Sequence, residues 1–586
     1  MGAGVGGAAL KSVPSSLNHA VLRAPPFPGL KEAQTAVLPP ALPFPDGDAR
    51  AALFENLRDA RVGGRFWAEP ANLTQPPEII LRPRTITDMS ELAPDSRGRA
   101  LWVSRDPALH PALALESAAD WLADVDPWSV LSGAGSLLAH GDDEWVALAR
   151  VAGVPVRVLS PGQFGAPGDD DEALDAKAAQ ALSIPMRDPF GDGWLSPHDA
   201  IALLAEWRRV IDANRGGNGE AIVAVCGMAW WKRSEIRRFL WLPGKQVQII
   251  SSPRKALALA AAKGGAVAVW PSRVSPALIS EAQARGVPLV RIEDGFVRSV
   301  GLGSNLVPPS SIVVDRQGIH FDPRAPSDLE TILAQTEFTP ELCARARRLG
   351  ETIVAAGISK YAASGSLHEA PTERPSDRRV ILVPGQVEDD MSVLAGGGGL
   401  TSNLELLRRA RGLEPDAEIW WRSHPDVDAG HRNGAVPDEA ALKYADRIVR
   451  GGGMAPLLDV VDAVHVLTSL TGFEALMRGC EVTCHGAPFY SGWGLTRDLA
   501  QVPDRRGRKL SLEELIAGVL ILYPRYLDPI TGLPCPPEVL VARMAQNRMV
   551  NRQGWIGPVR RVQGRLMAYL RSHGGKNTSP DIAAPT

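Results

Sequence analysis

Short runs of apolar residues alternate with segments of helical periodicity along most of the chain. Before residue 300, four of these runs are rich in Val, Ile and Ala: 221–227, 246–250, 266–270 and 287–292. A polar segment at 364–377 interrupts the pattern, which resumes with four further runs: 380–384, 417–422, 447–450 and 463–467. Continuously apolar runs separated by helices are typical of parallel strands that are covered on both faces. The pattern therefore predicts an α/β chain with two parallel sheets, one on each side of the linker.

Two segments of the N-terminal third resemble segments near the end of the second sheet, in the same order. Residues 125–133 (VDPWSVLSG) resemble 461–469 (VDAVHVLTS), and 195–202 resemble 510–517. We interpret 95–215 as a degenerate copy of the second sheet and its closing helices. Chance similarity between helices rich in Ala and Leu is the alternative.

These patterns predict six segments. In order they are a flexible leader (1–45), the degenerate partial module (46–215), a first Rossmann-like domain (216–370), a second Rossmann-like domain (378–508), closing helices (509–571) and a disordered tail (572–586). Ligands of such sheets bind at the carboxyl ends of the strands, so these ends are where functional residues are expected.

The composition excludes several classes of protein. The 63 Lys and Arg residues against 66 Asp and Glu residues give a net charge of −3, which predicts no nucleic-acid partner. No apolar stretch is long enough for a transmembrane helix, and the start of the chain does not resemble a secretory signal. The five scattered cysteines fit a reducing cytoplasm, and Cys480 with Cys484 lacks the second ligand pair of a zinc site.

Two strand ends carry catalytic types of side chain. Glu293, Asp294 and Gly295 follow the run at 287–292, and His424 with Pro425 follows the run at 417–422. Gly295 permits a tight turn that directs a carboxylate into a cleft, and Pro425 fixes the backbone beside the imidazole. A solvated acidic turn and a structural histidine are the alternatives.

A third strand end carries hydroxyl groups. Thr468, Ser469 and Thr471 lie between the run at 463–467 and an expected helix, so hydroxyl and backbone N–H groups could bind a phosphate there. The alternative is a helix cap, with Glu474 completing a capping box. Both can hold, since a cap turn can also be an anion site.

Two further loops complete the set. Residues 384–392 (PGQVEDDMS) follow the first strand of the second domain, and 486–496 (GAPFYSGWGLT) form an aromatic loop. The acidic loop is expected to close over a ligand or to be bare surface, and the aromatic loop to line the cleft or only to pack.

Together these loops resemble one family. The motifs EDGFVRSVGLGS, PGQVEDD, HPDV, TSLTGFEAL and APFYSGWGLT are similar to those of the bacterial capsule β-Kdo transferases of the KpsC/KpsS type, over about residues 220–535. The resemblance implies a GT-B-like fold, in which two Rossmann-like domains face each other. It also implies a retaining glycosyltransferase that moves the acidic sugar Kdo from CMP-Kdo to a glycolipid acceptor in capsule biosynthesis.

The resemblance further implies roles for individual side chains. Asp294 is expected to be the nucleophile and Glu293 to support it, because a carboxylate nucleophile gives retention through two inversions. The expected CMP-binding residues are His424, Pro425, Ser469, Thr471 and Glu474. The candidates for binding the sugar or the acceptor are Arg298, Lys232, Gln386 and Asp389. Neither a metal nor a cofactor is expected, because CMP leaves with a single phosphate.

The N-terminal copy departs from the family pattern. In the interpretation above, Ser132-Gly133-Ala134-Gly135 takes the place of the hydroxyl-rich turn, and 102–109 (WVSRDPAL) lacks a His-Pro pair. No Glu-Asp-Gly precedes it. We therefore expect residues 46–215 to be non-catalytic.

The expected partners follow from the implied reaction. They are a CMP-sugar donor, a lipid-linked glycan acceptor, capsule assembly proteins and, peripherally, the inner membrane on its cytoplasmic side. Membrane contact is expected through the basic stretch 505–509 or the segment 560–571. Two alternatives stay open, namely transfer of another CMP-activated nonulosonic acid and a catalytically silent scaffold for capsule assembly or export.

Overall fold

The chain forms two compact units. The computed structural model describes residues 21–30, 47–92, 97, 99–115, 121–217, 220–273, 275–300, 308–359, 361–362, 377–428, 430 and 432–546. Unit 1 comprises 1–293, 313–318 and 525–539, and unit 2 comprises 294–312, 319–524 and 540–586. The predicted linker falls almost wholly, and the predicted tail and the segment 560–571 entirely, outside the described residues.

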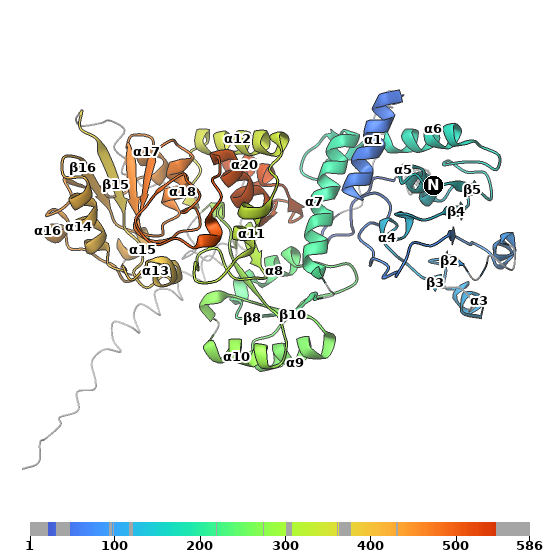
Figure 1. Cartoon of the computed structure of the whole chain (residues 1–586), viewed down its shortest axis with the longest axis horizontal. Coiled ribbons are helices and arrows are strands. Elements are labelled where there is room, and N and C mark those ends of the chain that lie inside the picture. Colours follow the sequence, from blue (N-terminus) through green and yellow to red (C-terminus); the bar gives the residue numbers. More distant parts are fainter. Residues whose placement is uncertain are drawn as a thin grey trace, which may run out of the picture. The chain divides into compact units, whose positions relative to one another are not determined.

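The N-terminal part of unit 1 is a five-stranded parallel sheet in the order β3-β2-β1-β4-β5. Its strands are β1 (Ile79–Leu81), β2 (Ala100–Val103), β3 (Trp121–Leu122), β4 (Ser136–Ala139) and β5 (Val156–Val158). Its helices are α1 (Gly47–Ala60), α3 (His110–Leu115), α4 (Trp128–Leu131), α5 (Glu144–Val151), α6 (Asp171–Leu182) and α7 (Pro197–Arg215). Helices α1 and α7 lie side by side (Figure 1).

Part of the predicted leader belongs to the core of unit 1. Val21, Leu22 and Phe27 are buried, and the Phe27 ring centroid lies 5.2 Å from that of Trp207 and 4.5 Å from that of Trp241. The prediction of a flexible leader is therefore wrong for residues 21–30, because these apolar side chains fill space between indoles distant in sequence. The other leader residues lie outside the described ones.

The second sheet of unit 1 has the order β22-β21-β13-β11-β10-β8-β9. Its strands are β8 (Ile222–Cys226), β9 (Gln248–Ile249), β10 (Ala266–Val269), β11 (Leu289–Asp294), β13 (Ser311–Asp315), β21 (Pro524–Leu527) and β22 (Pro534–Cys535). Helices α9 (Pro253–Lys263) and α10 (Pro276–Ala284) pack beside β8 and β10 (Figure 1). The predicted strands before residue 300 are confirmed.

The closing segment is not wholly helical as predicted. It begins with α19 (Leu512–Ile516) and the π-helical turn η8 (Ala517–Leu522), and it includes α20 (Pro537–Ala545). Between them, β21 and β22 pair antiparallel. All four residues of β21 are buried, which suits a strand inside a sheet better than an amphipathic helix.

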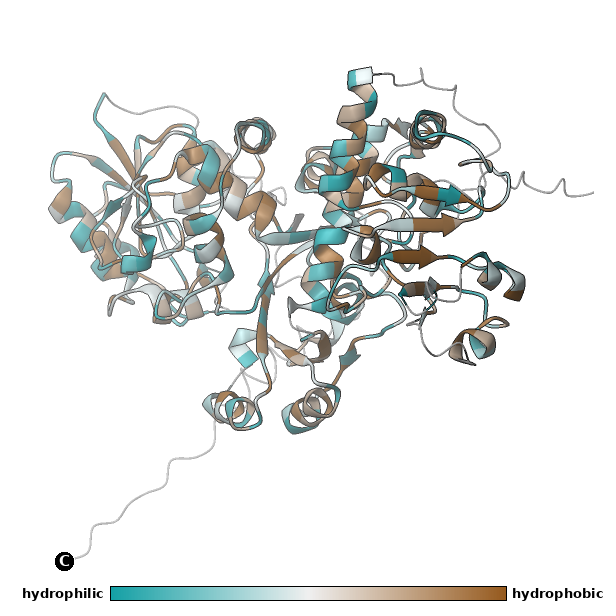
Figure 2. Ribbon diagram, turned by 45° about the vertical axis from the view of Figure 1, so that its right-hand side comes forward, coloured by the Kyte–Doolittle hydropathy of each residue, from teal (hydrophilic) through white to brown (hydrophobic). Residues whose placement is uncertain are grey.

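The sheet of unit 2 is parallel and has the order β17-β16-β15-β18-β19-β20. Its strands are β15 (Val380–Pro384), β16 (Glu418–Arg422), β17 (Arg447–Ile448), β18 (Ala463–Val466), β19 (Glu481–Cys484) and β20 (Arg497–Asp498). Its helices include α11 (Asp328–Gln335), α12 (Pro340–Ala355), α13 (Met391–Gly396), α14 (Asn403–Leu413), α15 (Pro425–Asp428), α16 (Asp438–Ala441), α17 (Met454–Leu458) and α18 (Thr471–Leu476). The predicted α/β architecture with parallel sheets is confirmed, and the strands are mostly brown in Figure 2.

The alignment of 125–133 with 461–469 is wrong. Residues 128–131 form helix α4, because Asp126 accepts a hydrogen bond from the amide of Trp128 and Pro127 begins the turn, whereas 463–466 form strand β18. In strand order, β3-β2-β1-β4-β5 of unit 1 corresponds to β17-β16-β15-β18-β19 of unit 2, so β4 is the counterpart of β18. The segment that corresponds to the hydroxyl-rich turn therefore begins at His140. A degenerate module over 46–215 stays a prediction.

Candidate functional site

The acidic pair forms the last two residues of β11. Asp294 accepts a hydrogen bond from Nε of Arg298 over 2.7 Å, and the side chains are 19% and 1% exposed, respectively. The amide of Gly295 donates to the carbonyl of Ser311 over 3.0 Å, so the chain just after Asp294 still lies beside β13. A Cβ on Gly295 would lie 2.2 Å from Oγ of Ser311, so only glycine fits. Arg298, a candidate for binding the sugar or the acceptor, thus contacts the expected nucleophile, and its role toward the substrate stays a prediction.

His424 lies at the start of helix α15. Its Nδ1 accepts a hydrogen bond from the amide of Asp426 over 3.1 Å, so it caps this short helix rather than the preceding strand. Because Nδ1 is an acceptor here, the neutral ring carries its proton on Nε2, which can donate to an anion. Pro425 begins the helix, where an N–H group is not needed. Next to it, the buried Arg422 donates to the carbonyls of Gly452 and Gly453, and burial lowers its pKa.

The hydroxyl-rich turn lies between β18 and α18, as predicted. Oγ of Ser469 accepts from the amide of Thr471 over 3.2 Å and donates to its Oγ1 over 3.0 Å. The capping box with Glu474 is not formed, because the cap residue is Leu470 and its side chain makes no cap hydrogen bond. Because α18 has only six residues, we expect an anion at its start to be bound mainly by the hydroxyl groups of the turn.

The loop at 384–392 is hydrogen-bonded to this turn. Nε2 of Gln386 donates to Oγ1 of Thr468 over 3.0 Å, and the amide of Thr468 donates to Oε1 of Gln386 over 2.8 Å. Both ends of the Gln386 side chain therefore hold the turn. Asp389, by contrast, is exposed and pairs with Arg432 over 3.2 Å, which places it outside this network.

Lys232 and Glu293 belong to unit 1, whereas the other candidates belong to unit 2. Nζ of Lys232 lies 3.5 Å from the ring centroid of Trp270 and 5.0 Å from that of Trp231. The lysine follows β8 and Trp270 follows β10. This cation–π cluster with its buried lysine therefore lies at the carboxyl edge of the second sheet of unit 1.

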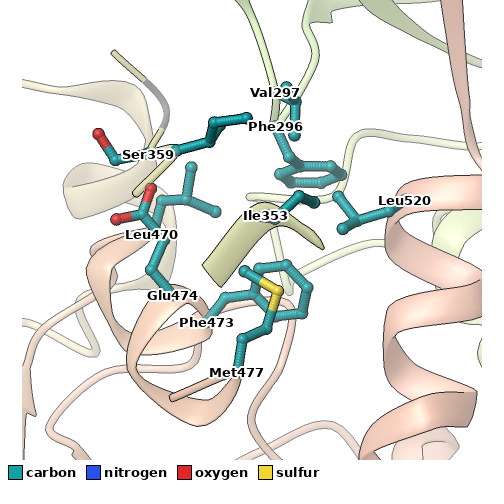
Figure 3. A pocket seen from close by; sticks show the side chains of 10 residues that line it. Phe296, Val297, Ile353, Ser359, Leu470, Phe473, Glu474, Met477 and Leu520 are labelled. Carbon is teal, nitrogen blue, oxygen red and sulfur yellow. The ribbon is translucent and has the colours of Figure 1, made fainter. Parts of the chain in front are cut away.

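A cleft in unit 2 is lined from both the acidic turn and α18. Phe296 and Val297 come from the turn, and Leu470, Phe473, Glu474 and Met477 come from the start and body of α18. Residues of α12, the loop after it and η8 complete the lining of this small cleft, which is partly open to solvent. Figure 3 shows the Glu474 carboxylate at one side of this otherwise mostly apolar lining. Two motifs that are about 180 residues apart thus meet at one cleft.

The basic stretch 505–509 is not a free surface, contrary to expectation. Nε of Arg505 and Nε of Arg506 each lie 2.6 Å from a carboxylate oxygen of the buried Glu330. Arg508 donates to the carbonyl of Thr336 over 2.8 Å and contacts Glu514. These partners could not be predicted from local sequence, because Glu330 lies 176 residues from Arg506.

The described residues contain no group of three or more His, Cys, Asp or Glu side chains that could hold a metal ion. No disulfide joins any of the five cysteines. Among the helices that the structure describes, none is long and apolar enough to span a bilayer.

Residues 265–526 match the family model described as "Capsule polysaccharide biosynthesis protein". Two solved modules of Thermosulfurimonas dismutans KpsC are also similar. The beta Kdo 2,7 transferase is 35% identical over 56% of this chain and 99% of its own, with a TM-score of 0.46. The beta Kdo 2,4 transferase is 31% identical over 55% and 98%, with a TM-score of 0.47.

The chain belongs to the capsule polysaccharide biosynthesis family. It is 42% identical over 333 residues to the capsule polysaccharide modification protein LipA of Neisseria meningitidis serogroup B. These residues make up 57% of this chain and 46% of LipA. It is 45% identical over 263 residues to the lipopolysaccharide-processing protein LpsZ of Rhizobium meliloti, which covers 44% of this chain and 59% of LpsZ. The chain thus spans about half the length of these family members.

Proposed function

We propose that this protein is a retaining glycosyltransferase that moves Kdo from CMP-Kdo to a glycolipid acceptor in the biosynthesis of capsular polysaccharide. Family membership and the similarity to KpsC modules support this activity. The observation that carries it is the cleft in unit 2, where the turn that follows Asp294 meets the start of α18. A GT-B arrangement of the two Rossmann-like domains is part of the proposal.

In the first step, the Asp294 carboxylate attacks the anomeric carbon of Kdo, and the bond from this carbon to the phosphate oxygen of CMP breaks. The product is a glycosyl ester of Asp294 and free CMP. In the second step, an acceptor hydroxyl attacks the same carbon, and the carboxylate leaves. Glu293 receives the hydroxyl proton, and two inversions give net retention. Arg298 favours the ionised form of Asp294 before the attack.

CMP is held by residues of unit 2. The Nε2–H group of His424 donates to the phosphate, and so do the hydroxyls of Ser469 and Thr471 once the hydrogen bond between them opens, while Glu474 accepts hydrogen bonds from the ribose. Pro425 keeps His424 in its capping position. One phosphate develops less charge than a diphosphate, so these donors stabilise the leaving group without a metal ion.

The remaining candidates take supporting roles. The ammonium group of Lys232 is proposed to bind the Kdo carboxylate, because a cation that is already desolvated loses little hydration on pairing. Gln386 is proposed to act indirectly through Thr468, and Asp389 to contact the acceptor from the surface. The acceptor is proposed to be presented at the inner membrane together with capsule assembly proteins.

Intact-mass spectrometry after incubation with CMP-Kdo tests this proposal. Wild-type protein should gain the mass of one Kdo residue, and Asp294→Ala should gain none and lose transfer. Asp389→Ala, which removes an exposed carboxylate, is the matched control and should still form the adduct. An adduct on Asp294→Ala would refute the assignment of the nucleophile.

The alternatives predict different results in the same assay. Competition between CMP-Kdo and other CMP-activated nonulosonic acids identifies the preferred donor sugar. A silent scaffold would neither release CMP from CMP-Kdo nor form an adduct.

A further inference from the structure

The hydroxyl-rich turn rests on a buried tyrosine that the proposed mechanism does not use. Tyr490 is 0% exposed, and its phenol donates a hydrogen bond to the carbonyl oxygen of Ser469. The amide of Gly472 donates to the same oxygen over 3.1 Å. Both lone-pair positions of this carbonyl are therefore occupied from within unit 2.

The direction of this carbonyl matters for an anion. A turn that binds a phosphate presents hydroxyl and N–H donors, and an inward-facing carbonyl oxygen would repel the phosphate oxygens. Because its partner Tyr490 is fully buried, the Ser469 carbonyl is held on the interior side of the turn. Oγ of Ser469 donates to Oγ1 of Thr471 over 3.0 Å, so the pair offers one hydroxyl proton to an anion while this bond lasts and two once it opens.

Tyr490 is itself fixed from two sides. A Cβ on Gly472 would lie 2.3 Å from the phenol oxygen, so glycine is required for the close approach of the ring to α18. The loop around Tyr490 is held by the buried Arg506, which donates to the carbonyl of Pro488 over 2.6 Å and to that of Ser491 over 3.3 Å. Glu330 in turn binds Arg506 over 2.6 Å.

We propose that Tyr490 is a positioning residue for the donor substrate, because it holds the Ser469 carbonyl inward and so keeps the turn receptive to the phosphate of a CMP-activated sugar. This inference rests on the proposed function. Burial raises the pKa of Tyr490 well above its usual value, so the phenol keeps its proton and remains a donor at physiological pH.

Tyr490→Phe removes this single hydrogen bond and keeps the ring. Calorimetric titration of the full chain with CMP should show a dissociation constant raised roughly three- to tenfold, the range for loss of one hydrogen bond. Cytidine, which lacks the phosphate, should bind to Tyr490→Phe as tightly as it binds to wild type. In turnover assays KM for CMP-Kdo should rise more than kcat falls. Tyr523→Phe removes another buried phenol of unit 2 and should leave the affinities for CMP and cytidine unchanged.

A second variant tests the same contact from the other partner. Gly472→Ala displaces the phenol and should again weaken the binding of CMP but not that of cytidine. This variant provides the test if Tyr490→Phe does not fold. Unchanged CMP binding, or an equal loss of CMP and cytidine, in the folded variants would overturn the role of Tyr490. If wild type bound no CMP, the proposed function would fail as well, so the two failures are distinguishable.

Discussion

Arg298 donates a hydrogen bond through Nε to Oδ2 of Asp294 over 2.7 Å, although the arginine side chain is almost completely buried. Burying a guanidinium group is costly unless a carboxylate or several acceptors compensate for the lost hydration. Asp294 provides this compensation, because its carboxylate accepts the hydrogen bond from Nε. A nucleophilic carboxylate must be ionised, so this pair supports the role that we propose for Asp294.

Loss of Arg298 should therefore impair the chemical step. Arg298→Met keeps the apolar stem but removes the hydrogen bond to a charged group, so we expect kcat to fall by about 10- to 100-fold. The acid limb of the pH–rate profile should move to higher pH, because the protonated carboxyl is favoured without the cation. Steady-state kinetics with CMP-Kdo between pH 5 and 8 measures both effects.

Arg291→Met is the matched control for this variant. Arg291 lies on β11, as Asp294 does, and its Nη1 donates to the carbonyls of Leu289 and Gln317 rather than to a carboxylate among the described residues. Its variant should retain the wild-type pH profile. A wild-type profile in Arg298→Met would show that the pair has no part in catalysis.

The buried carboxylate of Glu330 should be essential for the stability of unit 2. Glu330→Gln leaves Arg505 and Arg506 without their shared counter-charge, and the Arg506 side chain is 1% exposed. Removing one partner of a buried pair typically costs about 3–5 kcal/mol in the free energy of unfolding. Urea denaturation should show a loss of this order. The double variant Glu330→Gln/Arg506→Met should lose less than the sum of the single variants.

An exposed ion pair of the same unit provides the comparison. Arg450 and Asp438 form a pair whose side chains are 59% and 52% exposed. Arg450→Ala should change the free energy of unfolding by less than about 1 kcal/mol. Equal losses in Arg450→Ala and Glu330→Gln would contradict the importance of burial.

Four of the six strands of unit 2 (β15, β16, β17 and β18) could be predicted from runs of mainly apolar residues, whereas the short strands β19 and β20 were not predicted. Residues 380–384 match β15 residue for residue, and the side chains of this strand are all buried. Asp294, His424 and Ser469 could be singled out because functional groups collect where parallel strands end. Their roles in catalysis and in CMP binding stay predictions.

Long-range partners were not predictable in this way. The sequence predicts Arg298 as a candidate for binding the sugar or the acceptor but not its contact with Asp294, and it leaves open whether the loop of Tyr490 lines the cleft or only packs. Phe27 lies in a segment of leader-like composition, yet indoles from distant segments enclose it. Burial and charge compensation decide such contacts, and a single sequence does not record which segments meet.

The N-terminal sheet should bind no CMP. Its central strands β1 and β4 pair as β15 and β18 do, but the carboxyl ends are bridged by ion pairs. Nε of Arg82 donates to Asp143 over 2.6 Å, and Arg84 donates to Asp142 over 2.8 Å. These pairs stand where unit 2 has its hydroxyl-rich turn, and their guanidinium groups are already bound to carboxylates and would have to leave them to bind a phosphate.

Calorimetric titration of the full chain should therefore give one CMP site. His424→Ala removes a proposed donor to the phosphate and should weaken this site about tenfold or more. A second site, or a site that His424→Ala leaves at full affinity, would place CMP elsewhere, with the N-terminal sheet as the first candidate.

A buried histidine pair should make unit 2 sensitive to acid. Nδ1 of His465 lies 3.1 Å from Nε2 of His485, and both residues are almost fully buried between β18 and β19. Burial, with a smaller effect of His485, lowers the pKa of His465 to about 3, and burial lowers that of His485 to about 4. The charged groups that face the pair are Glu414, Arg379, Arg409 and Arg497.

The sign of the effect follows from the unfolded state. Both rings are neutral in the folded protein at pH 5, whereas histidines of the unfolded chain, with a pKa near 6.5, bind protons. The free energy of unfolding should therefore fall as pH decreases from about 7 to 5, by on the order of 2 kcal/mol for each histidine. Urea titrations at several pH values measure this loss in the free energy of unfolding. Hydrogen exchange in peptides that cover β18 and β19 shows whether the loss arises at the histidine pair.

His485→Gln tests the assignment, because glutamine can donate and accept hydrogen bonds but does not titrate in this range. The variant is expected to be less stable than wild type at pH 7 and to lose less stability between pH 7 and pH 5. The difference in slope, rather than the stability at either pH, isolates the histidine. If the variant and wild type lost the same free energy over this interval, the acid sensitivity would have to arise from carboxylates such as Glu414 instead.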